Sequence, residues 1–188
     1  MGSVFFITHP EVVIDPAVPV PRWHLSDRGI ARMRTLGRSP ALGGVASIWA
    51  SGETKAIEAA GILAGALILP VAIEPDLHEN DRSATGYLPP PKFERVADAF
   101  FARPNESVRG WERAVDAQSR IVAAVERVLA AAPPGDVAIV AHGGVGALLL
   151  CRLLDVPIAR EHDQPGQGSF FSFERASRRV LEGWAPIG

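Results

Sequence analysis

Short apolar runs that suit β-strands alternate along this sequence with segments of helical periodicity, and this alternation most restricts the fold. VFFIT at residues 4–8 and DVAIVA at residues 136–141 are almost entirely apolar, as expected for strands that are buried on both faces. The helical segments carry apolar residues three and four positions apart, most clearly in residues 110–132. The pattern predicts an α/β fold, a three-layer α/β/α sandwich with a mostly parallel central sheet.

The remaining elements follow from the same patterns and from their boundary residues. Ser26 is expected to cap a helix that stops at Gly37. Three proline-rich pieces, at residues 15–21, 88–91 and 132–135, are expected to be loops or turns. Further strands are predicted at 45–51 and 71–75, a closing hairpin at 169–175 and 178–186, and further helices at 53–65, 90–103 and 144–155.

Length and composition favour a single globular domain over residues 1–188. The chain is 47% hydrophobic and has a net charge of −2 with mixed signs, which argues against a general binder of nucleic acid or of membrane surfaces. No apolar stretch is long enough to span a bilayer, and the first residues lack the basic and apolar regions of a signal peptide. The single cysteine, Cys151, lies among apolar residues, so we expect a reducing, cytoplasmic location.

Two of the predicted strands end in histidine. His9 follows the first strand, and His142 follows the strand at 136–141. Ligands of such sheets bind at the carboxyl ends of the strands, so both histidines are expected at one rim. Gly143 and Gly144 lead from His142 into a helix, where exposed backbone N–H groups can face an anion. Either motif alone would more often be a capped surface histidine or a tight turn, but together they indicate a site.

The order of these motifs resembles the histidine phosphatase superfamily, also called phosphoglycerate-mutase-like. That family has Arg-His-Gly after its first strand, where this chain has THP at 8–10, and its Ser-His-Gly-Gly corresponds to AHGG at 141–144. Its Leu-Thr-x-x-Gly corresponds to LSDRG at 25–29, and its Ser-x-x-x-Arg-Ala-x-x-Thr-Ala to SGETKAIEAA at 51–60. Its Leu-x-Glu and Glu-Ser correspond to LHE at 77–79 and to the ES of NES at 105–107. The order extends over nearly the whole chain.

The resemblance implies roles for individual residues. His9 would be the nucleophile that accepts a phosphoryl group, and His142 would hydrogen-bond the phosphoryl oxygens. Glu79 would act as general acid towards the leaving alcohol and then as base towards water. His78 and Asp81 are alternatives for that last role, and the LHENDR segment could also be only a solvated loop.

The sequence departs from the family at its chemical centre. Thr8 stands where the first arginine is found, Lys55 stands in place of the second, and Pro10 replaces a glycine. A threonine supplies no charge, and a lysine lacks the bidentate fork of arginine. Arg22 or Arg82, both in predicted loops, could supply the missing cation. The alternative is that Arg22 is a surface charge and that Arg82 pairs with Asp81 or Glu79.

Two functions remain open from the sequence. The first is a phosphomonoesterase that acts on a small phosphorylated molecule through a phosphohistidine, with a mutase disfavoured because residues 73–107 leave little room for extra substrate cover. The second is a non-catalytic module that binds a phosphorylated ligand or a protein. A hydrolase with a serine nucleophile lacks a Gly-x-Ser-x-Gly elbow. No cofactor and no metal site are predicted, and the oligomeric state is not determined.

Overall fold

A six-stranded sheet forms the centre of the computed structural model, which describes residues 2–188. The strands lie in the order β3-β2-β4-β1-β5-β6. The pairs β1–β4, β2–β4 and β2–β3 are parallel, and β1–β5 and β5–β6 are antiparallel, which gives the mostly parallel sheet expected from the sequence. The strands are β1 (Ser3–Thr8), β2 (Val45–Ala50), β3 (Val71–Ile73), β4 (Asp136–Ala141), β5 (Ser169–Glu174) and β6 (Val180–Pro186).

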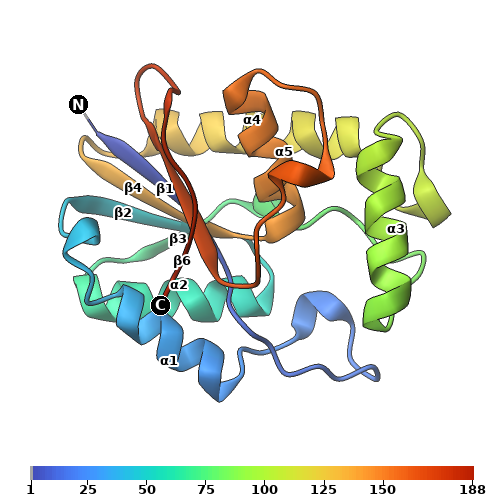
Figure 1. The fold of residues 1–188 in the computed structure, drawn as a ribbon. Helices are drawn as coiled ribbons and strands as arrows, with labels where there is room; N and C mark the ends of the chain where they lie inside the picture. Colours follow the sequence, from blue (N-terminus) through green and yellow to red (C-terminus); the bar gives the residue numbers. More distant parts are fainter. Residues whose placement is uncertain (1) are drawn as a thin grey trace.

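Helices cover both faces of this sheet. On one face lie α1 (Asp27–Leu36) and α2 (Thr54–Leu67), and on the other lie α4 (Ala114–Ala131) and α5 (Gly143–Leu154) (Figure 1). Alternate residues of β1 supply the two cores: Val4 and Phe6 pack with α4 and α5, while Phe5 and Ile7 pack with α1 and α2. The apolar run in β1 is therefore buried on both sides, and the three-layer sandwich is confirmed.

Helix α3 (Pro90–Ala102) stands apart from the two layers, beyond the carboxyl ends of the parallel strands (Figure 1). A third core joins it to α5, with Phe100, Phe101 and Trp111 packed against Ala147 and Leu148. The wall that α3 forms beside the sheet rim is therefore attached to the same helix that follows His142.

Short 3-10 turns form most of the connections that reach this rim: η1 (Val20–Arg22), η3 (Pro75–Leu77), η4 (Val108–Gly110) and η5 (Arg160–His162), with η2 (Pro40–Leu42) elsewhere. The helix expected at 110–132 begins at Ala114, because Trp111 (ψ 153°) and Arg113 (ψ 143°) have extended rather than helical backbone. Ser26 caps α1 as expected, accepting a hydrogen bond from the Gly29 N–H.

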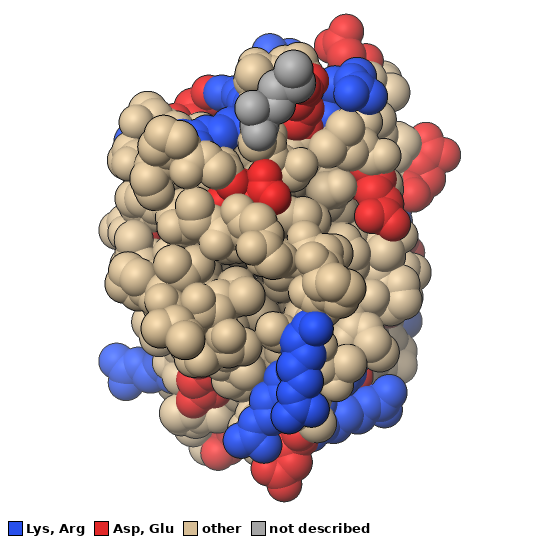
Figure 2. Space-filling view, turned by 90° about the vertical axis from the view of Figure 1, so that its left-hand side faces the viewer, with Lys and Arg blue, Asp and Glu red and all other residues tan. Residues whose placement is uncertain are grey.

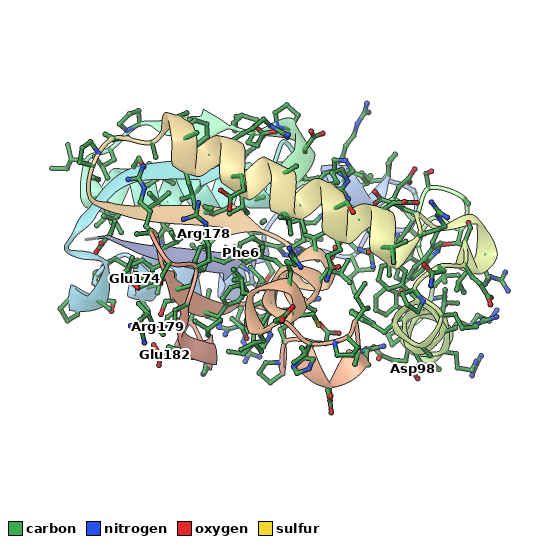
Figure 3. The ribbon with its side chains drawn as sticks, turned by 90° about the horizontal axis from the view of Figure 1, so that it is seen from above. Phe6, Asp98, Glu174, Arg178, Arg179 and Glu182 are labelled. Carbon is green, nitrogen blue, oxygen red and sulfur yellow. The ribbon has the colours of Figure 1, made fainter. Side chains whose placement is uncertain are left out.

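The closing hairpin of β5 and β6 is also confirmed. Figure 3 shows Glu174, Arg178, Arg179 and Glu182 around its turn, with Asp98 far away on α3. Arg178 pairs with Glu126 of α4 at 2.6 Å, which ties the hairpin to the helical layer above Phe6.

The parallel strands begin at one end of the sheet and finish at the other, beside the two histidines. Figure 2 views the end where the parallel strands begin, and its charged side chains lie mainly above and below an uncharged central area. The two histidines lie at the opposite end, beside several charged side chains. Within residues 2–188, none of the helices combines the length and apolarity that crossing a membrane requires.

Candidate active site

The pairing of β1 with β4 brings the two predicted histidines together. Thr8 is the register partner of Ala141, so His9 and His142 are the next residues on adjacent parallel strands. The His9 N–H donates to the Ala141 carbonyl oxygen at 3.1 Å and extends the ladder by one bond. The ring centroids are 5.3 Å apart in an edge-to-face arrangement (67°), which makes the pair the centre of the candidate site.

The His9 ring is held in one tautomer. Its Nδ1 lies 2.9 Å from the Pro10 carbonyl oxygen, which can only accept, so Nδ1 carries the hydrogen. Nε2 then has its lone pair free, and no hydrogen-bond partner for it is found within residues 2–188. Burial, together with the nearby charge of Lys55, lowers the pKa of His9 to about 4. The imidazole is therefore neutral at physiological pH, with a nucleophilic nitrogen available.

His142 is fully buried and precedes the first turn of α5. Its Nε2 lies 2.8 Å from the Ser51 hydroxyl and 3.4 Å from Glu53 Oε1, whereas its Nδ1 is buried without a partner in the described chain. Burial holds the pKa of His142 well below its usual range. A buried nitrogen beside His9 that lacks a partner is suited to contact a bound group.

Lys55 is buried at the start of α2 and is paired with Glu53, a residue that the sequence analysis did not single out. The Lys55 ammonium contacts the Glu53 carboxylate and donates to the Val20 carbonyl oxygen at 2.9 Å. Burial alone would raise the pKa of Glu53, but Lys55 keeps it below the usual range, so the pair is ionised. The other oxygen of Glu53 accepts from the Glu79 N–H at 2.9 Å.

Glu79 faces the amino terminus of α5. Its two carboxylate oxygens accept from the Gly144 N–H at 3.1 Å and the Val145 N–H at 3.0 Å. Burial would raise the pKa of Glu79, but the opposing effects of Arg82 and His142 hold it below the usual range. Gly144 permits this approach, because a Cβ there would lie 2.8 Å from Glu79 Oε1. The helix terminus thus already binds an anion of the protein itself.

Arg82 is the cation that pairs with the carboxylate of Glu79. Its Nη2 lies 3.8 Å from Glu79 Oε2, and its guanidinium stacks over the rings of Phe93 (5.1 Å) and Trp111 (5.5 Å). The two aromatic rings come from α3 and from the segment after η4, so the wall beside the rim fixes this cation.

Other predicted residues are placed differently. Thr8 is fully buried, and its hydroxyl accepts from the Ser169 N–H (3.0 Å) and donates its one hydrogen to either Gln164 Oε1 (2.6 Å) or Ser169 O (3.1 Å). Arg22 is exposed in η1, two residues beyond the Val20 carbonyl that holds Lys55. A direct contact of Thr8 or Arg22 with a ligand stays a prediction.

The two alternative acid–base groups make local contacts. Nδ1 of His78 lies 2.7 Å from the Glu79 carbonyl oxygen. The Asp81 carboxylate accepts from the Ser83 N–H at 2.8 Å, which keeps its pKa below the usual range. Of the three candidates, Glu79 is the one bound to the helix that follows His142.

Two further residues that shape the site were missed from the sequence. Gln164 lies over Gly143, where a Cβ would approach its Nε2 to 2.2 Å. Arg120 of α4 donates to the Asp76 carbonyl (2.7 Å), the His78 carbonyl (2.9 Å) and the Glu112 carboxylate (2.8 Å), and so holds the segment that carries Glu79. Glu53 could have been suspected because it stands two residues before Lys55, but nothing in the sequence pointed to Arg120 or Gln164.

Comparison with known proteins identifies the family. Residues 20–181 match the family model of the histidine phosphatase superfamily (branch 1). The chain belongs to the histidine phosphatase superfamily. A search of curated proteins finds no match. The matched range begins after His9, so the Thr-His-Pro departure lies outside it.

Solved structures share the fold of this histidine phosphatase superfamily member. Mycobacterial glucosyl-3-phosphoglycerate phosphatase in complex with VO3 is similar with a TM-score of 0.80 and 22% identity, covering 99% of this chain and 100% of that one. Its complex with inorganic phosphate has a TM-score of 0.78 and 19% identity, covering 100% and 99%. YhfR of Bacillus stearothermophilus has a TM-score of 0.81 and 21% identity, covering 97% and 95%. At these identities the similarity shows the fold alone.

Proposed function

We propose that the protein is a phosphomonoesterase that hydrolyses a small phosphorylated molecule through a phosphohistidine at His9. The observation that carries the proposal is the His9 ring, whose Nδ1–H is engaged by the Pro10 carbonyl while Nε2 is left free beside His142. A neutral imidazole with one nitrogen fixed and the other available is the form that can attack phosphorus near pH 7.

In the first step, His9 Nε2 forms a bond to phosphorus as the ester P–O bond breaks. The leaving oxygen takes a proton from the carboxyl group of Glu79. In the second step, water attacks the phosphorus, gives a proton to the Glu79 carboxylate, and the P–N bond breaks. Inorganic phosphate leaves, and His9 returns to the neutral imidazole.

Glu79 must hold a proton at the moment the alcohol leaves. In the ligand-free structure it is ionised, because two amides of α5 and Arg82 stabilise the carboxylate. A phosphoryl dianion that enters beside His9 opposes that stabilisation and raises the affinity of Glu79 for a proton. The bound substrate therefore prepares its own general acid.

Lys55 and Arg82 are the proposed cations for the phosphoryl oxygens, together with the Nδ1 of His142 and the first amide of α5, that of Gly143. Arg82 takes the place of the arginine that Thr8 replaces. The phosphate and VO3 complexes of the mycobacterial phosphatase, which shares the fold, support a phosphoryl group as the ligand.

The test is rapid mixing with 4-nitrophenyl phosphate. We expect a burst of about one 4-nitrophenol per active site, with the phosphoryl group retained on the protein in an acid-labile form and lost in His9→Ala. His24→Asn, which changes an exposed histidine that pairs with Glu58, is the matched control and should keep the burst. Slow release without a burst, combined with no phosphorylated His9 by mass spectrometry, would refute this mechanism.

A second function is favoured by one observation. Both proposed cations are already paired with carboxylates, Lys55 with Glu53 and Arg82 with Glu79. Such a site could bind a phosphorylated ligand or protein without transferring its phosphoryl group. Saturable phosphate binding without any burst from aryl phosphates would establish this second function in place of the first.

A further inference from the structure

Glu53 stands at an unusual place for a carboxylate, because it lies among the side chains that are proposed to bind a phosphoryl dianion. It is buried, and its Oε1 lies 3.4 Å from Nε2 of His142 and 2.9 Å from the Glu79 N–H that donates to it. Its Oε2 pairs with Lys55. One carboxylate therefore connects the second histidine, the segment of the proposed acid and the buried lysine.

An ionised carboxylate can only accept hydrogen bonds, which has a consequence for the His142 tautomer. A lone pair on Nε2 would face the negative oxygen of Glu53, whereas an Nε2–H would be attracted to it. The Ser51 hydroxyl, 2.8 Å from the same nitrogen, can accept such a hydrogen as readily as it can donate. Charge then favours hydrogen on Nε2, because an N–H directs positive partial charge towards the Glu53 carboxylate 3.4 Å away, and such an attraction is strong in a buried site.

Hydrogen on Nε2 leaves Nδ1 as a bare lone pair, and this is the nitrogen that is buried without a partner among residues 2–188. A lone pair repels a phosphoryl oxygen, so the neutral ring in this tautomer is unsuited to contact the ligand. It becomes a donor only when Nδ1 takes up a proton. The imidazolium that results donates from Nδ1 to the phosphoryl group and from Nε2 to the Ser51 hydroxyl, and the Glu53 carboxylate lies close to the same N–H.

We propose that Glu53 is a positioning residue that makes phosphoryl binding require a proton on His142, and that this protonated ring adds its positive charge to those of Lys55 and Arg82. The inference deepens the proposed phosphatase function and rests on it. Without a ligand, burial and the charges of Lys55 and Arg82 oppose the proton, while Glu79 favours it; His9 at the end of β1 opposes it only when charged. A bound dianion reverses that balance.

The test uses protein labelled with ¹⁵N in its histidines, with long-range ¹H–¹⁵N spectra at pH 7.5 in the absence and presence of vanadate. The His142 signals are assigned by their loss in His142→Asn. In the free wild-type protein we expect hydrogen on Nε2 alone, and with vanadate we expect both nitrogens protonated. Glu53→Gln, which keeps the size of the side chain, should allow Ser51 to donate to Nε2, giving hydrogen on Nδ1 alone in both states.

Glu58→Gln is the matched control, since Glu58 lies on the same helix and also contacts a histidine, His24, outside the site. It should leave the His142 signals unchanged. Ser51→Ala provides a second variant in case Glu53→Gln does not fold, because it should leave hydrogen on Nε2 if Glu53 sets the tautomer. Hydrogen on Nδ1 in the free wild-type protein, or a neutral ring with vanadate bound, would overturn the inference.

The pH profile supplies a readout that a purely structural role would not change. For the wild-type protein we expect kcat/KM to fall by up to about tenfold per pH unit on the alkaline side, because His142 must be protonated. In Glu53→Gln, kcat/KM should change by less than about twofold over the same alkaline pH range. Absence of vanadate binding in the wild-type protein would refute the proposed function, while the tautomer of the free protein would still decide the role of Glu53.

Discussion

The candidate site has two parts that are built in different ways. His9 and His142 are placed by the backbone, since each follows a buried strand and the two strands pair in register. The charged groups around them are placed by one another: Glu53 with Lys55, and Glu79 with the terminus of α5 and with Arg82. The histidine pair depends on the sheet, whereas the charges depend on a network of side chains from separate segments.

The two parts therefore have different roles: the histidine pair carries out the proposed reaction, and the charged network adjusts its rate and pH dependence. The histidine pair alone gives a nucleophile and a neighbouring ring, and its geometry survives as long as β1 and β4 pair. The charged network decides whether a phosphoryl dianion is compensated and when Glu79 holds a proton. Substitutions in the first part should therefore remove the reaction, and substitutions in the second should change its rate, its pH dependence or the stability of the fold.

The largest effect is expected for His9→Ala. Loss of the only proposed acceptor of the phosphoryl group should reduce turnover of 4-nitrophenyl phosphate to the background, a fall of at least about 10³-fold. The far-ultraviolet circular dichroism should be unchanged, because the β1–β4 ladder does not need the ring. Turnover that persists within about tenfold of the wild-type rate would show that the histidine pair does not carry the chemistry.

Glu79→Gln should affect substrates unequally. Alkyl phosphates need a proton on the leaving oxygen, so their turnover should fall by about 10²–10⁴-fold, whereas phosphorylation by aryl phosphates should be nearly unchanged. Single-turnover rates for a matched aryl and alkyl pair measure the difference. Equal losses for both would transfer the acid role to His78 or Asp81, and the same pair of rates measured in His78→Asn and Asp81→Asn would identify which.

Lys55→Met tests the buried pair of Lys55 and Glu53 through the free energy of unfolding. Glu53 would be left as a buried carboxylate without its cation, which should lower the free energy of unfolding at pH 7.5 by about 3–5 kcal/mol. In the wild-type protein the pKa of Glu53 is lowered, so the pair stabilises the fold above the unfolded pKa, and that contribution is lost as pH falls.

In Lys55→Met the pKa of Glu53 should instead rise, so the carboxyl becomes neutral on acidification. The difference in stability between variant and wild type, measured by urea unfolding, should therefore shrink from pH 7.5 to pH 5. The exposed pair of Arg113 and Asp116 supplies the control, and Arg113→Met should have little effect at either pH. A deficit of Lys55→Met that grows on acidification would contradict an ionised Glu53.

The smallest effect is expected for Arg120→Met. Arg120 holds the segment of Glu79 through backbone carbonyls, so its loss should displace the carboxylate and slow alkyl phosphates by about 10–10²-fold. Arg127, on the same helix, binds the side chains of Glu74 and Asp76 at the exposed end of that segment. Arg127→Met should change the rate by about twofold or less. Equal effects would mean that Arg120 does not position Glu79.

Local patterns in the sequence encode the strands, the helices and the place of the two histidines. Apolar runs fixed β1 and β4, helical periodicity fixed the covering helices, and Ser26 marked the start of α1. Because parallel strands end at one rim, the position of a histidine after each strand was enough to predict that His9 and His142 lie at the same rim, and the pairing of β1 with β4 makes them neighbours. These features depend on neighbours in the chain, and so they can be read from it.

How the charged pairs meet one another depends on tertiary packing. Glu53 lies two residues before Lys55 and Glu79 lies three residues before Arg82, but the contacts between these two segments and with α5 depend on how α2, α3, α5 and the 76–82 segment pack. The same packing buries the Thr8 hydroxyl against Gln164 and leaves Arg22 exposed. Electrostatic energies depend on distance and burial, and for residues far apart in sequence neither is encoded locally, so the protonation chemistry of the site required the fold.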